Sequence, residues 1–365
     1  MRRMTVLRAL FAGALTAVMA LAAGITAGAQ EPPGPQPSAQ QQGPETAPPP
    51  PAQPNGQPPA QANQKKPEYS IAVTSNLVNV DVVVTNQDGD VLTGLTKENF
   101  RVIDDGQAQV ITNFTPSEAP LTIVMVMEYS ARFFNVYAWT SVYWGSDFVN
   151  HLNKNDWLAL VTYSMQTTVR CDFTQNKQEV LETMRTLGFP DFHEANEFDA
   201  ILDTLDRLQD VKGKRAIVLL TSGADTFSKH TLDQVYKRLR QSDVPIFSVG
   251  TAEMEHITND NIGYLQAKNE LDTFGRMTGG YAWFPRFDGE IPGIFQSVAA
   301  FLRNQYTIGF VPSNAARDGK YHKLKIEVVE PDGTPFTTTN KKGKKQKVVV
   351  YAREGYTAPT GAAAD

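Results

Sequence analysis

Cysteine is almost absent from this chain of 365 residues, and the one cysteine, Cys171, excludes an intrachain disulfide. An excess of basic charge is also absent, since the formal net charge is -5, so nothing in the composition favours nucleic-acid binding. The five histidines are dispersed without metal-ligand spacing, and no glycine-rich loop is present to hold a phosphate. The sequence is long enough for about two domains, stabilised by apolar packing rather than by disulfides.

The first 29 residues have the pattern of an export signal. Arg2, Arg3 and Arg8 precede an apolar stretch over 9–23, and the small residues 27–29 follow. We predict a signal peptide over 1–29 that is cleaved after Ala29, so the mature chain is expected to be secreted, periplasmic or in the cell envelope. The alternative is an uncleaved membrane anchor, although the stretch is short and alanine-rich for a span, and only then is membrane association expected.

Residues 30–68 contain no aromatic residue, valine, leucine or isoleucine, and they are rich in proline and glutamine. Such a segment cannot bury enough apolar surface to offset the entropy of ordering it. We predict a disordered linker whose prolines favour extended, semi-rigid stretches. Residues 359–365 are predicted to be a short disordered tail.

The remaining chain changes pattern twice. Residues 69–118 and 305–358 alternate apolar and polar positions between Asp-Gly turns, which indicates β structure. Residues 119–304 alternate strand-length apolar runs with amphipathic helices, which indicates a doubly wound, mostly parallel α/β sheet of six strands. Segments of about 50 residues are marginal alone. We therefore expect the two β segments to form one small sandwich-like module around the inserted α/β domain; two separate β modules are the alternative.

A polar triplet follows the first apolar run of the α/β domain. Leu121–Met127 read as a buried strand, and Glu128, Ser130 and Arg132 come next at alternate positions. Because ligands of doubly wound sheets bind at the carboxyl ends of the strands, this triplet is predicted to lie at a functional crevice.

The order of several motifs resembles that of von Willebrand factor type A (VWA) domains. Glu-x-Ser-x-Arg stands where that family has Asp-x-Ser-x-Ser, and Phe198–Ile201 match the start of a family helix. Ala216–Gly223 (AIVLLTSG) and Val244–Gly250 match its fourth and fifth strands. With the flanking β segments, residues 69–358 resemble the bacterial secreted VWFA-related proteins, which implies a Rossmann-like sheet and a binding function.

The resemblance implies a site for Mg²⁺ or Mn²⁺, and the sequence departs from that site. The family uses the Asp and both Ser of its first motif, a Thr from a second loop and an Asp after the fourth strand. Carried over, these positions hold Glu128, Ser130, Arg132, approximately Ala195, and Ser222. Only Ser130 keeps its residue type, and an arginine offers no lone pair to a metal.

We therefore hypothesise that Glu128 and Arg132 form an internal ion pair in place of a metal. Two alternatives stay open. In the first, Arg132 turns to solvent and Glu128 is a solvated acid at the strand end. In the second, a metal is retained on Glu128 and Ser130 because Asp191, Glu194 and Asp225 rebuild the site. No cofactor is expected, with Mg²⁺ or Mn²⁺ as the exception that the second alternative allows.

Catalytic patterns are weak in this sequence. Ser222 follows a strand, but Leu220 stands where a nucleophile elbow needs glycine. Cys171 lies in a strand-like run and is expected to pack rather than react. We therefore expect a protein that is not an enzyme; a hydrolase using Ser222 is the distant alternative.

The expected function is binding of an unknown protein or peptide through the crevice loops, independent of metal. Phe133 and Phe134 beside an arginine have the composition of a protein-binding hot spot. A metal-dependent VWA adhesion module and a structural or assembly protein of the envelope are the alternatives. The predicted binding residues are Glu128, Ser130, Arg132, Phe133, Phe134, Glu194, Asn196, Ser222 and Asp225.

Overall fold

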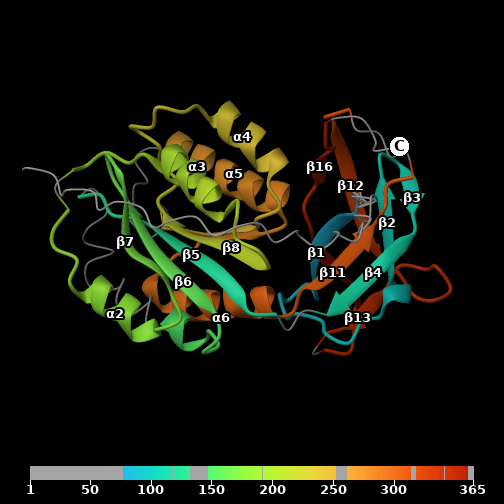
Figure 1. Cartoon of the computed structure of the whole chain (residues 1–365). Coiled ribbons are helices and arrows are strands. Elements are labelled where there is room, and N and C mark those ends of the chain that lie inside the picture. The colour runs from blue at the N-terminus through green and yellow to red at the C-terminus, as the bar shows by residue number, and fades with distance from the viewer. Residues whose placement is uncertain are drawn as a thin grey trace, which may run out of the picture. The chain divides into compact units, whose positions relative to one another are not determined.

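A six-stranded sheet forms the centre of the α/β domain (Figure 1). The computed structural model describes residues 77–116, 119–131, 147–190, 192–251, 261–313, 318–340 and 342–360. In spatial order, the strands are β10 (Tyr281–Trp283), β9 (Ile246–Gly250), β8 (Lys214–Thr221), β5 (Leu121–Glu128), β6 (Trp157–Tyr163) and β7 (Thr167–Thr174). All neighbours are parallel except β6 and β7.

The apolar run that the sequence shows before Glu128 becomes a central strand. β5 pairs with β6 on one side and β8 on the other, so both of its edges are hydrogen-bonded within the sheet. Met125 and Val126 are completely buried on opposite faces, as expected of a strand inside a parallel sheet. Because β5, β6 and β8 run in one direction, their carboxyl ends meet at one edge of the sheet.

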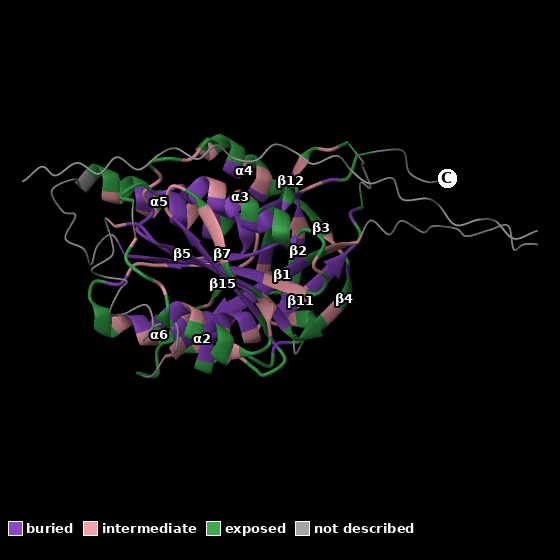
Figure 2. Ribbon diagram, turned by 60° about the vertical axis from the view of Figure 1, so that its left-hand side comes forward, coloured by how far each residue is buried: buried purple, intermediate pink, exposed green. Residues whose placement is uncertain are grey.

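Helices cover both faces of this sheet (Figures 1 and 2). One face packs against α3 (Glu197–Leu208), α4 (Leu232–Gln241) and α5 (Asn261–Thr278). The other packs against α2 (Lys177–Arg185) and α6 (Ile291–Arg303). Residues 147–150 and the short 3₁₀ turns Lys97–Asn99 and Asp288–Glu290 are the remaining helical segments among the described residues.

Two helices differ from what the sequence pattern indicates. The amphipathic pattern predicts a helix from Asn269, whereas α5 begins at Asn261, in a stretch that includes Gly263 and the exposed apolar residues Ile262 and Leu265. The pattern also does not single out α6, which carries Pro292 in its first turn. Proline is tolerated there because its missing N–H has no partner within the helix.

The two flanking β segments share their sheets, and this confirms the predicted joint module. One sheet has the order β15 (Val349–Tyr351), β1 (Val78–Thr85), β11 (Tyr306–Phe310) and β4 (Ile111–Pro116). The other has the order β16 (Gly355–Thr357), β12 (Tyr321–Val328), β2 (Phe100–Asp104) and β3 (Gln107–Gln109). Side chains of both sheets fill one apolar core. A hairpin of β13 (Thr337–Thr339) and β14 (Lys345–Lys347) completes the module.

The module also contacts the α/β domain directly. Tyr351 of β15 packs against Tyr281 of β10 and Phe301 of α6, with ring centroids 5.1 Å apart in both pairs. Over the described ranges, no helix combines the length and the apolar character that crossing a membrane requires.

Candidate functional site

Glu128 lies buried at the carboxyl ends of β5 and β8, where the sequence predicts a crevice. Its Oε1 accepts a hydrogen bond from the Ser130 hydroxyl at 2.9 Å. Its Oε2 accepts two bonds from Ser222, one from the backbone N–H and one from the hydroxyl, both at 2.8 Å. The side chain is completely buried. The interpretation of Glu128 as a solvated acid is therefore wrong, because the longer glutamate side chain reaches across to the end of β8.

Burial raises the pKa of Glu128 above its ordinary value, and the hydrogen bonds from Ser222 and Ser130 oppose this shift. Desolvation disfavours the carboxylate, whereas donors that point at it favour the charged form. The residues after β8 are thus arranged around the acid of β5, with both Glu128 oxygens satisfied from within the protein.

A second buried acid, Glu197, lies beside Glu128. It is the first residue of α3, and its Oε2 accepts a hydrogen bond from the Tyr163 hydroxyl at 3.1 Å and one from the Thr221 hydroxyl. Burial raises the pKa of Glu197 to about 8, and the nearby charge of Glu128 contributes to the rise. Glu197 is therefore largely protonated at neutral pH, which lowers the negative charge beside Glu128.

The sequence analysis missed Glu197. An acid in the first turn of a helix is common because the helix dipole favours it there. Its burial arises from packing against β6 and β8, through Tyr163 and Thr221. The only available signal was its place directly after the loop that the family resemblance assigns to the crevice.

The other predicted binding residues have separate surroundings. Asn196 is buried, and its amide lies 3.4 Å from the Thr167 hydroxyl. Asp225 is half-buried and accepts a hydrogen bond from the first-turn N–H of Phe198, so it caps α3. Burial raises the pKa of Asp225. Glu194 is exposed at the rim.

Three predicted residues, Arg132, Phe133 and Phe134, lie outside the described residues, as does Asp191. The ion pair between Glu128 and Arg132 therefore stays a prediction. Ser130 and Ser222 are brought together with Glu128 as described above, whereas Glu194 and Asp225 are not among the hydrogen-bond partners of that carboxylate.

Exposed aromatic rings lie on the crevice loops at positions that the sequence analysis did not select. Phe192 and Phe227 are each 47% exposed, and Phe189 is 81% exposed. The backbone carbonyl of Ala195 accepts hydrogen bonds from Thr226 and Phe227, which joins the loop before α3 to the loop after β8. The Phe-Pro-Asp-Phe run over 189–192 was the signal available, since apolar rings beside a proline stand outside any predicted helix or strand.

A cavity of about 190 Å³ lies beside these rings. The hydroxyl and aromatic side chains of Tyr129, Thr162 and Phe192 line it, together with the guanidinium side chain of Arg170. The backbone N–H of Ala131 donates to the carbonyl of Phe192 at 2.6 Å, which holds the end of β5 against this loop. The carboxyl ends of the strands thus combine a fully hydrogen-bonded Glu128 with an exposed aromatic rim on the neighbouring loops.

The residues present do not fit the metal site of the VWA family. Arginine at 132 and alanine at 195 offer no side-chain oxygen, and Ser222 removes the negative charge that an aspartate would supply. The Glu128 oxygens are taken up by Ser130 and Ser222.

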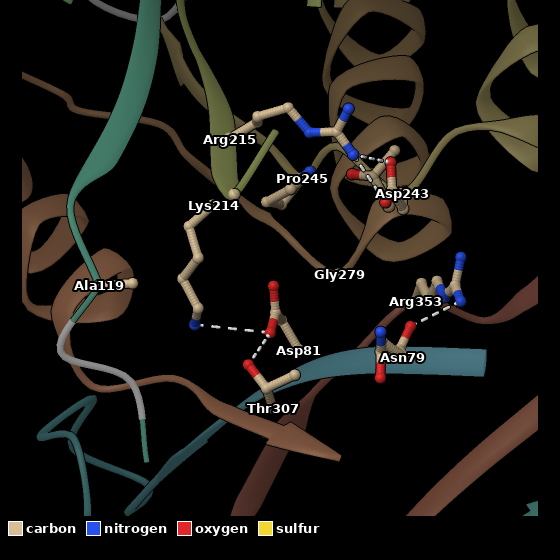
Figure 3. A pocket seen from close by; sticks show the side chains of 12 residues that line it. Asn79, Asp81, Ala119, Lys214, Arg215, Asp243, Pro245, Gly279, Thr307 and Arg353 are labelled. Carbon is tan, nitrogen blue, oxygen red and sulfur yellow. Dashed lines mark hydrogen bonds and ion pairs between the residues drawn. The ribbon is translucent and has the colours of Figure 1, made fainter. Parts of the chain in front are cut away.

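A separate cavity of about 400 Å³ lies at the opposite, amino ends of β8 and β9, where the β module meets the α/β domain (Figure 3). Two of its cationic side chains form ion pairs. Lys214 Nζ lies 3.5 Å from Asp81, and Arg215 contacts Asp243 at 2.6 Å. Arg353 donates to the carbonyl of Asn79 at 2.7 Å. Of these contacts, the ion pair of Lys214 with Asp81 joins the α/β domain to the β module, and no predicted site residue lines the cavity.

Comparison with known proteins follows this geometry. Among curated proteins, none matches this sequence. Similar solved structures include BatB from Bacteroides thetaiotaomicron, with 14% identity and a TM-score of 0.36, covering 50% of this chain and 100% of that one. The vWF domain of the type V pili tip protein Mfa5 from Porphyromonas gingivalis has 11% identity and a TM-score of 0.39, covering 49% and 94%. Proximal thread matrix protein 1 from the mussel byssus has 16% identity and a TM-score of 0.42, covering 54% and 49%.

The family of von Willebrand factor type A domains matches residues 97–274, a range that includes the crevice and most of the central sheet. The observed strand order, with a single antiparallel edge strand and helices on both faces, agrees with that match. Residues 97–274 of this chain therefore belong to the von Willebrand factor type A family.

Proposed function

We propose that this chain is a binding module, without enzymatic activity, that engages a protein or peptide through the crevice loops and needs no divalent cation to do so. The observation that carries the proposal is the closed hydrogen bonding of Glu128, whose two carboxylate oxygens accept from Ser130 and Ser222. A cation at Glu128 would have to compete for both oxygens without an aspartate at 222.

The aromatic rim supports recognition of a macromolecule. Phe192 and Phe227 project from loops that are joined through the Ala195 carbonyl, so the two rings are held on a connected scaffold. Exposed aromatic side chains on a rigid support lose little conformational freedom when a partner covers them, and they often dominate binding energy. The exposed Glu194 adds a charged contact beside them.

Ser222 is a poor nucleophile in this arrangement. Its hydroxyl donates to Glu128, and the residue is 2% exposed, so a substrate cannot approach it without rearrangement of the loop. The raised pKa of Glu197 belongs to a completely buried acid, which lacks access to a bound substrate. These features support a binding role over hydrolysis.

The proposal places the module outside the cytoplasm. Two features of the sequence support this location. Residues 1–29 have the export-signal pattern, and the proline-rich segment 30–68 separates this pattern from the folded part. Such a spacer suits a module that reaches a partner across the envelope or at the cell surface.

Titration calorimetry with Mg²⁺, Mn²⁺ and Ca²⁺ tests the metal independence. The native chain is expected to show no binding at the crevice. The variant Glu128→Asp/Arg132→Ser/Ala195→Thr/Ser222→Asp restores the family's residues and serves as the positive control, expected to gain affinity for Mg²⁺. Native binding tighter than about 1 mM that Glu128→Ala abolishes would overturn the proposal.

Capture of partners from envelope extract tests the surface. Phe192→Ser/Phe227→Ser is expected to lose the captured partner, with chelator making no difference to the native chain. Val110→Ser is the matched control, because Val110 is also an exposed apolar residue, at 79%, but lies in the β module. Equal capture by all three proteins would exclude the aromatic rim as the binding surface.

A further inference from the structure

A compact group of acids and one imidazole lies in the β module, far from the crevice in the sequence. Asp104 ends β2, Asp105 begins the turn to β3, and His322 lies in β12. Within the described ranges, this is the one group of three or more His, Cys, Asp or Glu residues whose ligand atoms lie within 4.8 Å of one another.

Each carboxylate of this group is held by one oxygen. The Tyr356 hydroxyl donates to Asp104 Oδ2 at 3.0 Å, and the backbone N–H of Lys323 donates to Asp105 Oδ1 at 2.8 Å. The remaining oxygens face the same ring nitrogen of His322. Asp105 Oδ2 lies 3.0 Å from Nδ1, and Asp104 Oδ1 lies 3.6 Å from it.

The facing atoms are buried and have no hydrogen-bond partner. This holds for Asp104 Oδ1 and for both ring nitrogens of His322, whose side chains are 1% and 7% exposed. The contacts to Asp104 and Asp105 are close in distance, but neither has the geometry of a hydrogen bond from the ring. Buried polar atoms are usually paired, and here three unpaired atoms belong to two side chains that face each other, so an additional ligand is indicated.

The separations fit ligands of one shared metal ion. With metal–ligand bonds of about 2.1 Å, ligand atoms 3.0 and 3.6 Å apart subtend angles of about 90° and 118° at the metal. An ion in this position would lie on the ring-nitrogen lone pair. Both oxygens would then lie off the ring axis, which explains why neither forms a hydrogen bond to Nδ1.

We propose that Asp104 Oδ1, Asp105 Oδ2 and His322 Nδ1 bind a divalent transition-metal ion, with Zn²⁺ as the best match. Imidazole and carboxylate together suit Zn²⁺, whereas Mg²⁺ prefers oxygen ligands alone. The Asp105 side chain is 45% exposed, so water can complete the coordination from the solvent side.

The surroundings supply the supporting contacts that such sites use. Tyr356 fixes Asp104, and its ring stacks on His322 with centroids 5.2 Å apart. Asp318 Oδ1 lies 3.9 Å from His322 Nε2, the nitrogen that would carry the proton when Nδ1 binds a metal. The ammonium of Lys320 pairs with the other oxygen of Asp318 at 3.3 Å.

The site would connect two distant parts of the chain. Asp105 and Lys323, which are already joined by a hydrogen bond, are 218 positions apart in the sequence, with the whole α/β domain between them. A metal that binds both β2 and β12 closes this long loop and stabilises the folded module over the unfolded chain.

Titration of the metal-free, full-length chain with ZnCl₂ against a chromophoric chelator tests the proposal. We expect one Zn²⁺ per chain and an unfolding temperature raised by several degrees. Asp105→Asn should weaken binding at least tenfold without loss of folding, because Asp105 has φ +46° and asparagine tolerates this conformation. His322→Ala should weaken it further, and Co²⁺ should show a visible spectrum that Asp105→Asn alters.

His230→Ala is the matched control, since His230 Nδ1 also contacts a carboxylate, Asp199 at 2.8 Å, but at an exposed position. It should leave the affinity for Zn²⁺ unchanged, as should Glu128→Gln in the crevice. The proposal is overturned by affinity weaker than about 1 mM. It is equally overturned by binding that survives both Asp105→Asn and His322→Ala, or by binding that Glu128→Gln removes.

Discussion

Two buried acid clusters, one in the crevice and one in the β module, satisfy their oxygens in different ways. Around Glu128, hydroxyls and one backbone N–H supply the donors that the structure describes, and all point at the carboxylate within hydrogen-bond distance. Around Asp104, one oxygen accepts from Tyr356, while the other faces an imidazole without a hydrogen bond.

The two clusters differ in how the hydrogen-bonding capacity and the negative charge of their acids are compensated. Both oxygens of Glu128 accept hydrogen bonds from its own chain, whereas Glu197 keeps one buried oxygen, Oε1, without a hydrogen-bond partner and is largely protonated at neutral pH. The cluster of the β module keeps an atom with unused capacity on each of three side chains, Asp104, Asp105 and His322. Burial of an acid therefore does not by itself indicate a metal site; the donors that point at both oxygens of Glu128 distinguish it from Asp104.

The largest expected effect concerns the proton on Glu197. Its pKa of about 8 in the folded state exceeds the ordinary value of 4.5, so the folded state holds a proton that the unfolded state releases between these values. The free energy of unfolding should therefore fall as pH rises from about 4.5 to 8, by up to about 5 kcal/mol. Denaturant unfolding across this range measures the decline.

Glu197→Gln cannot ionise and should remove the part of this slope that comes from Glu197, leaving the contribution of Glu128, whose pKa burial also raises. Glu194→Gln, an exposed neighbour in the same loop, should leave the slope unchanged. If the free energy of unfolding of Glu197→Gln fell with pH as steeply as that of the native chain, the pH dependence would not come from the proton on Glu197.

A second prediction removes one of the hydrogen bonds to Glu128. Ser222→Ala removes the hydroxyl that donates to Glu128 Oε2 and keeps the backbone N–H. Because the carboxylate stays buried, we expect a loss of about 1–3 kcal/mol in the free energy of unfolding. Ser313→Ala, at an exposed position, should cost less than about 0.5 kcal/mol. Equal losses would mean that the Glu128 contacts contribute nothing specific.

A third prediction removes the support of the other cluster. Tyr356→Phe deletes the hydroxyl that donates to Asp104 Oδ2, and burial already raises the pKa of Asp104. Thermal unfolding in chelator should show a loss of about 1–2 kcal/mol. If the hydrogen bond is the cause, Tyr356→Phe/Asp104→Asn should cost less than the two single changes together. Strict additivity would contradict this assignment.

The smallest expected effect is at an ion pair outside both clusters. Arg101 and Glu327 lie 3.7 Å apart with side chains 47% and 29% exposed. Arg101→Ala should change the free energy of unfolding by less than about 0.5 kcal/mol, since water screens exposed pairs. If Arg101→Ala lowered the free energy of unfolding as much as Ser222→Ala, burial would not explain why contacts in the clusters contribute more than contacts at the surface.

The sequence predicted the frame of the crevice better than its chemistry. The apolar run that ends at Glu128 identified a central strand, and the fold class is confirmed by the six-stranded sheet and the shared β sheets. The contact between Glu128 and Ser222 joins residues 94 positions apart, so it depends on which strand lies beside β5. The position of that strand was indicated by the family resemblance rather than by local periodicity.

The second cluster could not be read from the sequence. Asp105-Gly106 was correctly interpreted as a turn between strands, and both residues have positive φ. His322 was interpreted as one of several isolated histidines. Only the antiparallel pairing of β2 with β12, which sets Asp104 opposite Leu324, brings these residues together. Pairing over such a distance leaves no periodic signal in either segment.

The order of strands in the β module has a mechanical consequence. β4 and β11, which lead into and out of the α/β domain, pair with each other, as do β1 and β11. A pulling force applied between Leu77 and Thr360 would therefore be carried by the hydrogen bonds of the β module while the α/β domain stays outside the path of tension. The geometry of the α/β domain would then stay unchanged while the β module is under load.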